Sequence, residues 1–381
     1  MFEPSAEDQE ILAHSEAALN RIFADAHKLK EDDEKELFDP SIMRSLGEEG
    51  LCGITTASEY EGFGRGYYTY ALVLEAIAKR SASYAVSVAV NGLPQMILQN
   101  FGNEAQRAEW MTALATGGAL GAFALSEPES GSDAASLQTT AVRDGNDYVL
   151  NGRKFWITHG GYADVYVVMA RTGGSGPKGI SAFLVPKDSQ GLSFGKKEEK
   201  MGLRASPTVE LILENVRIPV QNLLKEEGRG FEVAMSALDS GRITIGAIGV
   251  GLAQAALEQA TAYACVRKQF NKPIIDFQGV GFMLADMAIQ IESARLLVHK
   301  AAILKDAGRP YSLNAAMAKC AATDAAMKVT TDAVQVLGGY GYTREYPLER
   351  YMRDAKVMQI VEGTNQIQRY VISKKLKGLH L

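Results

Sequence analysis

The stretch Met358-Gln-Ile-Val-Glu-Gly-Thr-Asn-Gln-Ile-Gln-Arg369 places a single glutamate, Glu362, between two helical patterns. Apolar residues precede Glu362, and Gly363-Thr364 interrupts the period before a second amphipathic run begins. The pattern predicts a helix-to-helix junction with Glu362 facing the interior, where burial would raise its pKa and suit it to act as a base near neutral pH. The same residues also fit a solvated helix end, with Gly363 after the last turn and Thr364 capping the next helix.

Helical patterns extend from this stretch toward the N-terminus. Apolar residues recur at helical spacing in four runs near residues 230–266, 279–306, 312–337 and 350–376. Four long helices are enough for an antiparallel bundle, and small residues such as Gly246 and Gly249 favour close packing of the first run. Residues 1–119 also show helical spacing, so helices are expected at both ends of the chain.

Between about residues 120 and 227 the pattern changes to short β-rich runs separated by Gly, Ser, Pro and Lys turns. Asn151-Gly152 joins two of these runs and predicts a hairpin turn. The expected fold class is α+β multidomain: an N-terminal α-helical domain (1–119), a middle β-barrel-like domain (120–227) and a C-terminal four-helix-bundle domain (228–381).

Composition excludes several classes of protein. The 381 residues are 46% hydrophobic and 22% charged, with a net charge of −5, so no bulk field attracts nucleic acid or anionic lipid. The apolar stretch Ile243–Leu257 is rich in Gly and Ala and is expected to be a buried helix, not a membrane span. The first twenty residues carry too many acids for a secretory signal.

Three cysteines without a CxxC pair are consistent with free thiols in a reducing compartment, and the five histidines lack metal-ligand spacing. We therefore expect a soluble protein without a metal site, in the cytoplasm or, for a processed eukaryotic form, in the mitochondrial matrix.

Two stretches of the middle region carry candidate binding groups. The loop Phe123–Asp133 offers Ser126, Ser130 and Ser132 at the boundary between helical and β regions, where ligand clefts are common, although it also fits an ordinary capping loop. Trp156 and Thr158 lie two residues apart on one strand and are expected to face the same side, where they could hold a planar heteroaromatic ring. A single buried Trp beside a β-former is the alternative.

Three stretches of the helical bundle contain candidate anion-binding groups. Asp239 and Arg242 lie at i,i+3, where they could pair with each other or reach a phosphate-bearing ligand. Arg267-Lys-Gln-Phe270 follows a helix end and would suit a pyrophosphate, although basic residues are favoured there in any case. Gln335-Val-Leu-Gly-Gly-Tyr-Gly341 ends another helix with more glycines than a C-cap requires.

Taken together, these stretches resemble the acyl-CoA dehydrogenase family over essentially the whole chain and in the same order. The matching stretches are Ala124–Asp133, Lys154–Thr158, Lys200–Arg204, Arg267–Phe270, Gln335–Gly341 and Val361–Thr364. The resemblance implies a flavoprotein oxidoreductase with non-covalent FAD that acts in fatty acid metabolism such as β-oxidation. It also implies a homotetramer, with an electron-transfer flavoprotein as the electron acceptor.

The resemblance also assigns roles to individual residues. It implies that Glu362 is the catalytic base, and that FAD contacts come from Phe123, Leu125, Ser126, Ser132, Trp156, Ile157, Thr158, Arg267, Phe270, Gln278, Gln335, Gly338, Gly339, Thr364 and Gln366. Those from Arg267 to Gly339 would hold the diphosphate and adenosine parts across a subunit interface. Acyl-CoA contacts are implied for Ser132, Asp239, Arg242 and Gly363.

The implied reaction removes the α-proton of an acyl-CoA thioester by Glu362 and the β-hydrogen as a hydride to flavin N5, which gives a trans-2-enoyl-CoA. Some relatives carry the base on an earlier bundle helix, but the matching residue here is Gly241, which cannot serve. Leu238–Ile243 and Phe282–Ala288 look closest to short-chain and branched-short-chain members. Alternatives are an acyl-CoA oxidase, although typical oxidases are much longer, and a flavin-binding relative without dehydrogenase activity.

Overall fold

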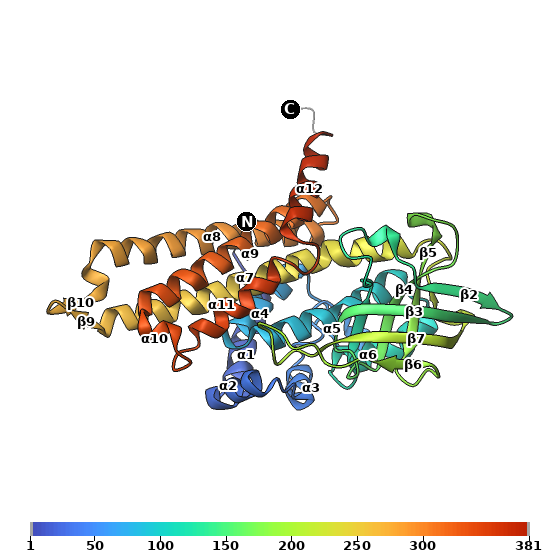
Figure 1. Ribbon diagram of the computed structural model, residues 1–381, viewed down its shortest axis with the longest axis horizontal. Helices are drawn as coiled ribbons and strands as arrows, with labels where there is room; N and C mark the ends of the chain where they lie inside the picture. The colour runs from blue at the N-terminus through green and yellow to red at the C-terminus, as the bar shows by residue number, and fades with distance from the viewer. Residues whose placement is uncertain (1–2, 379–381) are drawn as a thin grey trace.

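A computed structural model describes residues 3–378 and shows helical segments at both ends of the chain, with a β-sheet at one end of the long axis (right of Figure 1). The N-terminal helices are α1 (Ala6–Ile22), α2 (Ala26–Lys35), α3 (Pro40–Glu48), α4 (Tyr67–Arg80), α5 (Ala82–Phe101) and α6 (Glu104–Ala115). The C-terminal helices are α7 (Gly230–Val266), α8 (Gln278–Asp306), α9 (Ser312–Leu337), α10 (Gly339–Tyr342), α11 (Leu348–Met358) and α12 (Asn365–Leu376). The expected α+β architecture is confirmed, whereas the domain boundaries remain a prediction.

The middle region forms one sheet in the order β6-β7-β3-β2-β4-β5-β8, with β1 pairing in parallel with β4. Its strands are β1 (Gly121–Ala124), β2 (Thr140–Asp144), β3 (Asp147–Thr158), β4 (Val165–Arg171), β5 (Ile180–Pro186), β6 (Leu192–Phe194), β7 (Thr208–Pro219) and β8 (Leu223–Leu224). β4 and β5 are buried almost throughout, which explains their continuous apolar runs. A short ribbon, β9 (Lys268–Gln269) and β10 (Lys272–Pro273), follows α7.

The prediction of a hairpin turn at Asn151-Gly152 is wrong. β3 runs through both residues, and the turn instead lies at Gly145-Asn146, where Asp144 faces Asp147. The pairing register of β3 with β7 shifts at Gly152, which marks a β-bulge. A side chain at Gly152 would place its Cβ only 2.4 Å from Thr139 Oγ1, so the glycine serves close backbone approach within a strand.

The run predicted near residues 350–376 is two helices rather than one. α11 ends at Met358, α12 begins at Asn365 and points away from the bundle (top of Figure 1), and Glu362 lies between them. The predicted helix-to-helix junction is therefore confirmed. It brings Glu362 beside α7 and α9, the long helices of the bundle.

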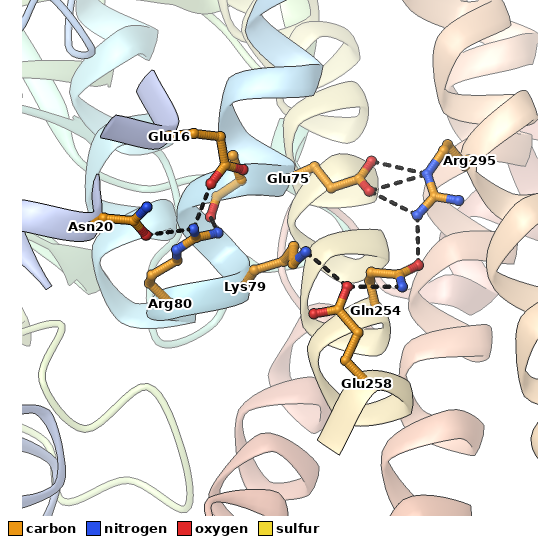
Figure 2. A network of polar contacts seen from close by, with 9 residues as sticks. Glu16, Asn20, Glu75, Lys79, Arg80, Gln254, Glu258 and Arg295 are labelled. Atoms are coloured by element: carbon orange, nitrogen blue, oxygen red, sulfur yellow. Dashed lines mark hydrogen bonds and ion pairs between the residues drawn. The ribbon is translucent and has the colours of Figure 1, made fainter. Parts of the chain in front are cut away.

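The N-terminal helices share a core with the bundle. Buried apolar residues from all parts of the chain form one cluster, and an added Cβ at Gly251 of α7 would lie 2.3 Å from the Glu75 carbonyl oxygen of α4. Figure 2 shows polar contacts across the same boundary: Arg295 of α8 donates to the Glu75 carboxylate and, at 2.9 Å, to Gln254 Oε1 of α7. Within residues 3–378, α7 is the one helix long and apolar enough to cross a membrane, yet 78% of its most apolar window is buried inside the molecule.

Candidate functional site

The junction that carries Glu362 has an unusual backbone. Glu362 and Gly363 both have positive φ, at 54° and 86°, and this left-handed pair reverses the chain between the two helices. Such a conformation is costly for a residue other than glycine and persists only where the surroundings enforce it. Gln368 of α12 contributes to this, because its Nε2 donates to the carbonyls of Glu362 at 3.1 Å and Gly363 at 2.8 Å.

The helix ends on both sides also stabilise the junction. The Thr364 hydroxyl caps α12 by accepting the Ile367 N–H at 3.2 Å, as the capping alternative anticipated. The Asn365 N–H donates to the Gln359 carbonyl at 2.9 Å and closes the loop. Capping and a functional Glu362 are therefore compatible.

The Glu362 carboxylate lies against α7. An added Cβ at Gly241 would be 2.4 Å from Glu362 Oε2, so the carboxylate fills the space that the missing side chain leaves free. Oε2 is shielded from solvent and has no hydrogen-bond partner among the described residues, although Glu362 as a whole is only half-buried. Burial raises the pKa of this carboxyl to about 7, against the opposing charges of Arg242 and Lys319.

Arg242 and Asp239 of α7 pair with each other, as the simpler alternative anticipated. The Arg242 guanidinium contacts the Asp239 carboxylate one helical turn away, and Ser312 donates to the same carboxylate at 3.1 Å. Because Arg242 is buried beside Glu362, its charge also acts on that carboxylate. These two predicted substrate contacts therefore lie near the candidate base, whereas Ser132 is exposed on the loop after β1.

The loop after β1 is fastened to β3 by a buried ion pair. Lys154 is fully buried and donates from Nζ to Glu127 Oε1 at 2.7 Å and to the Leu125 carbonyl at 3.0 Å. The Phe155 N–H donates to the Ser126 carbonyl at 2.9 Å. Burial lowers the pKa of Lys154 to about 8 although Glu127 opposes the shift. Lys154 belongs to one of the stretches that resemble the family, but its role in this ion pair was not predicted from the sequence.

At the end of β3 a second bulge changes the direction of the side chains. Trp156 has a φ of 62° and is 62% exposed, Ile157 is buried and Thr158 is half-buried. Phe123 is half-buried on β1, which lies beside β4. The exposed indole of Trp156 is thus free to cover a planar ligand at this end of the sheet.

A second set of predicted cofactor residues lies at the opposite end of the molecule. Arg267, Gly338 and Gly339 line an open pocket of about 620 Å³ together with Tyr263 and Tyr340. No atom of the described part of the chain lies within 4 Å of an added Cβ at either glycine, so a ligand can approach the backbone there. In Figure 1 this end, marked by β9, β10 and α10, is separated along the long axis from the sheet that carries Trp156.

Phe270, Gln278 and Gln335 belong to the same end without lining that pocket. Phe270 is 87% exposed in the turn between β9 and β10, Gln278 begins α8 and Gln335 lies near the end of α9. Thr364 and Gln366 lie instead beside Glu362 at the start of α12. The cofactor residues predicted on the β-sheet and those predicted around Arg267 therefore form two separate groups within one chain, and Thr364 and Gln366 lie apart beside Glu362.

Lys319 of α9 is a site residue that the sequence reasoning missed. Its Nζ donates to the Gly363 carbonyl at 2.9 Å. The available signal was a lone lysine within the Ala-rich run Ala315-Ala-Met-Ala-Lys-Cys-Ala-Ala-Thr323. Within residues 3–378, no three side chains of His, Cys, Asp or Glu gather where they could hold a metal ion.

Family models match the chain in three consecutive segments. The model for "Acyl-CoA dehydrogenase, N-terminal domain" matches residues 6–118, the middle-domain model residues 122–216 and the C-terminal-domain model residues 228–377. The chain is 45% identical to a short-chain-specific acyl-CoA dehydrogenase of Clostridium acetobutylicum over 348 residues, which covers 91% of this chain and 92% of the relative.

Solved structures agree over nearly the full length. Butyryl-CoA dehydrogenase of Megasphaera elsdenii superposes with a TM-score of 0.96 at 42% identity and covers 99% of this chain and 100% of that chain. A chain from a structure described as an electron transferring flavoprotein of Acidaminococcus fermentans gives 0.96 at 45% identity, covering 99% of both. A glutaryl-CoA dehydrogenase of Mycobacterium smegmatis in complex with FADH2 gives 0.93 at 30% identity, covering 99% and 96%.

Proposed function

The chain belongs to the acyl-CoA dehydrogenase family, and we propose that it converts a short or branched short acyl-CoA thioester to the trans-2-enoyl-CoA. Membership makes it an oxidoreductase that acts on acyl-CoA and uses FAD. The short-chain preference draws support from the short-chain-specific relative and from the butyryl-CoA dehydrogenase structure.

The Glu362 carboxylate is the observation that carries the proposal. Its Oε2 is shielded from solvent and has no hydrogen-bond partner in residues 3–378, and its pKa is raised to about 7. It can therefore take up a proton near neutral pH without first breaking an ion pair. Glu362 breaks the α-C–H bond and keeps the proton. The electron pair left on the α-carbon forms the new double bond while the β-hydrogen leaves with its own electron pair.

The residues of this chain fit FAD. Arg267 can bind a diphosphate, and the open backbone at Gly338 and Gly339 permits close approach. Lys154 holds Leu125 in place, and the Phe155 N–H holds Ser126. Bound FAD would supply the acceptor for the β-hydrogen, which leaves as a hydride. In this proposal the exposed indole of Trp156 would cover one side of the ring system and exclude water from it.

The separation of the two predicted cofactor groups supports an oligomer in which a second copy completes each site. Phe282, Ile289 and Leu296 are exposed at seven-residue intervals along α8, which would suit burial against another copy. A homotetramer and an electron-transfer flavoprotein as acceptor are the assembly and the partner that we expect. The cytoplasm or the mitochondrial matrix remains the predicted location.

Anaerobic titration of the purified protein with acyl-CoA thioesters tests the reaction. We expect butyryl-CoA or isobutyryl-CoA to bleach the flavin absorbance more readily than long-chain thioesters. Failure of every thioester to bleach it would contradict the proposal. Reoxidation of the bleached flavin by oxygen at turnover rates would instead indicate an acyl-CoA oxidase.

Glu362→Gln tests the assigned base. The variant should bind FAD and acyl-CoA, whereas the rate of bleaching should fall by roughly two to four orders of magnitude, the usual range for loss of a general base. Glu214→Gln, which changes an exposed glutamate on β7, is the matched control and should bleach normally. Native bleaching by Glu362→Gln would exclude Glu362 as the base.

A further inference from the structure

Lys319 is fully buried on α9 and has two strong acceptors, neither of which is a carboxylate. Its Nζ donates to the Gly363 carbonyl at 2.9 Å and to Asn365 Oδ1 at 2.8 Å. Within residues 3–378, no carboxylate lies within ion-pair distance of this ammonium, and burial lowers its pKa to about 8. Since burial of a charge without an ion-pair partner disfavours the folded state, the presence of Lys319 here requires another explanation.

The two acceptors lie on either side of the turn that follows Glu362. Asn365 in turn donates from Nδ2 to Thr323 Oγ1 at 2.9 Å and to Asp324 Oδ1 at 2.7 Å. Asp324 also accepts from Gln359 at 2.7 Å, so α9 holds the beginning and the end of the junction. Lys319 of α9 and Gln368 of α12 both donate to the carbonyl of the left-handed Gly363, and Lys319 is the charged donor of the two.

Two cations act on the Glu362 carboxylate: Arg242 of α7 and Lys319 of α9. Arg242 is already neutralised in part by its ion pair with Asp239. The titratable and charged groups that act on Lys319 are Glu362, Cys320, Asp324 and Arg242, and Asp324 is paired with Arg369 of α12. Lys319 therefore offers Glu362 a positive charge that no close carboxylate neutralises.

We propose that Lys319 is a positioning residue for proton abstraction, which fixes the turn that aims Glu362 at the substrate and helps to keep its carboxylate ionised. The inference rests on the proposed function, because it assumes that Glu362 removes the α-proton. It extends that function by making α9, which carries Lys319, part of the unit that removes the proton.

The charge and the hydrogen bonds of Lys319 have separate consequences. Without the positive charge, the pKa of Glu362 rises further, and the pH midpoint of flavin reduction should move upward by about one pH unit, the low end of the effect of a nearby opposite charge. Below the midpoint that shift lowers the rate about tenfold, and at high pH the difference disappears. Without the bond to Gly363, the rate should also fall at high pH, because Glu362 is less well aimed.

Three variants separate these effects. Lys319→Gln removes the charge and keeps a donor, Lys319→Met removes both, and Lys319→Arg keeps the charge. Lys328→Met is the matched control, because Lys328 lies on the same helix, is 60% exposed by its side chain and pairs with Asp332 at the surface. FAD content and the thermal midpoint are measured first for each variant.

Two measurements then follow. The first is the pH profile of flavin reduction by the thioester that bleaches the native protein. The second is α-hydrogen exchange of 3-thiabutyryl-CoA in deuterated buffer by NMR, because sulfur at the β-position permits loss of the α-proton and prevents hydride transfer. The native protein is the reference: if no thioester bleaches it, the proposed function fails before Lys319 is tested.

If the flavin of the native protein bleaches, we expect the pH midpoints of flavin reduction and of α-hydrogen exchange to be higher in Lys319→Gln and Lys319→Met. Lys319→Met should also be slower at every pH. Lys328→Met should have the native rates and the native pH midpoints. Folded Gln and Met variants with the native pH profile would overturn the inference. If Lys319→Met does not fold, the pH profile of Lys319→Gln decides the test by itself. Failure of all three variants to fold would also overturn it, since Lys319 would then serve the fold and not the reaction.

Discussion

Gly241→Ala tests whether the Glu362 carboxylate occupies the space beside α7 during catalysis. The new Cβ would lie 2.4 Å from Oε2 and 2.7 Å from Cδ of Glu362, whereas ordinary contact begins at 3.4 Å, so the carboxylate must retreat by about 1 Å. Because the obstructed atoms end a flexible side chain, the fold can absorb the change. Misplacement of a reacting group by about 1 Å can cost about 100-fold in rate.

The free energy of unfolding of Gly241→Ala should rise while the rate of flavin reduction falls. Alanine is favoured over glycine in a helix interior by about 1 kcal/mol, and position 241 lies well inside α7. We therefore expect a variant that binds FAD, unfolds no more easily than the native protein and reduces its flavin about 100-fold more slowly. An overall packing defect would instead lower stability and activity together.

Stopped-flow bleaching with a saturating active thioester and thermal unfolding at matched FAD occupancy provide the two readouts. Gly249→Ala on the same helix is the control, because its Cβ would meet the Ala322 carbonyl oxygen at 3.3 Å and stays away from Glu362. It should leave the bleaching rate within about twofold of native. A Gly241→Ala variant that bleaches as fast as native protein would refute the placement of the carboxylate beside α7.

Three further outcomes are expected. Arg267→Ala should lose FAD and loosen the oligomer together, since a diphosphate held across subunits links both equilibria; sedimentation that shows an intact oligomer without FAD would contradict the interface role. Glu362→Gln should melt at a higher temperature than native protein at pH 8 but not at pH 5, because a carboxyl whose pKa rises from 4.5 to about 7 on folding loses stability as pH rises through that window. If the melting temperatures of Glu362→Gln and native protein differ by the same amount at pH 8 and at pH 5, burial of the Glu362 charge is contradicted. Gly241→Glu combined with Glu362→Gln should recover part of the bleaching rate, because the side chain of residue 241 would start beside the place that the Glu362 carboxylate occupies. A double variant that bleaches no faster than Glu362→Gln would contradict this recovery.

The sequence was most informative where a local pattern and a tertiary demand coincide. Gly363 breaks the helical period at the place where the structure needs a left-handed backbone, so the junction around Glu362 could be predicted. Long helical periods and short β-rich runs likewise predicted the α, β, α order. At Asn151-Gly152 a local turn signal gave way to long-range pairing, because Gly152 is required for its approach to Thr139.

Other features depend on contacts that no local pattern reveals. Lys319 and Lys154 are fully buried, and each grips a backbone carbonyl distant in sequence, in Gly363 and Leu125 respectively. A lone lysine among apolar residues could have marked such a site without naming its acceptor. The position of Gly241 against Glu362 also follows only from the packing of α7 on the junction.

The contact between Glu75 and Arg295 bears on how the chain folds as it leaves the ribosome. Helix α4 emerges early, but Arg295, which donates to the Glu75 carboxylate, follows 220 residues later. At typical synthesis rates of roughly 5–20 residues per second, this interval lasts about 10–40 s. The face of α4 that packs on α7 stays uncovered until α7 has been made, and the Glu75 carboxylate lacks its α8 partner for the whole interval. The first six helices therefore emerge with an unfinished surface that a chaperone can bind, and they reach their final form only once α7 and α8 have been made.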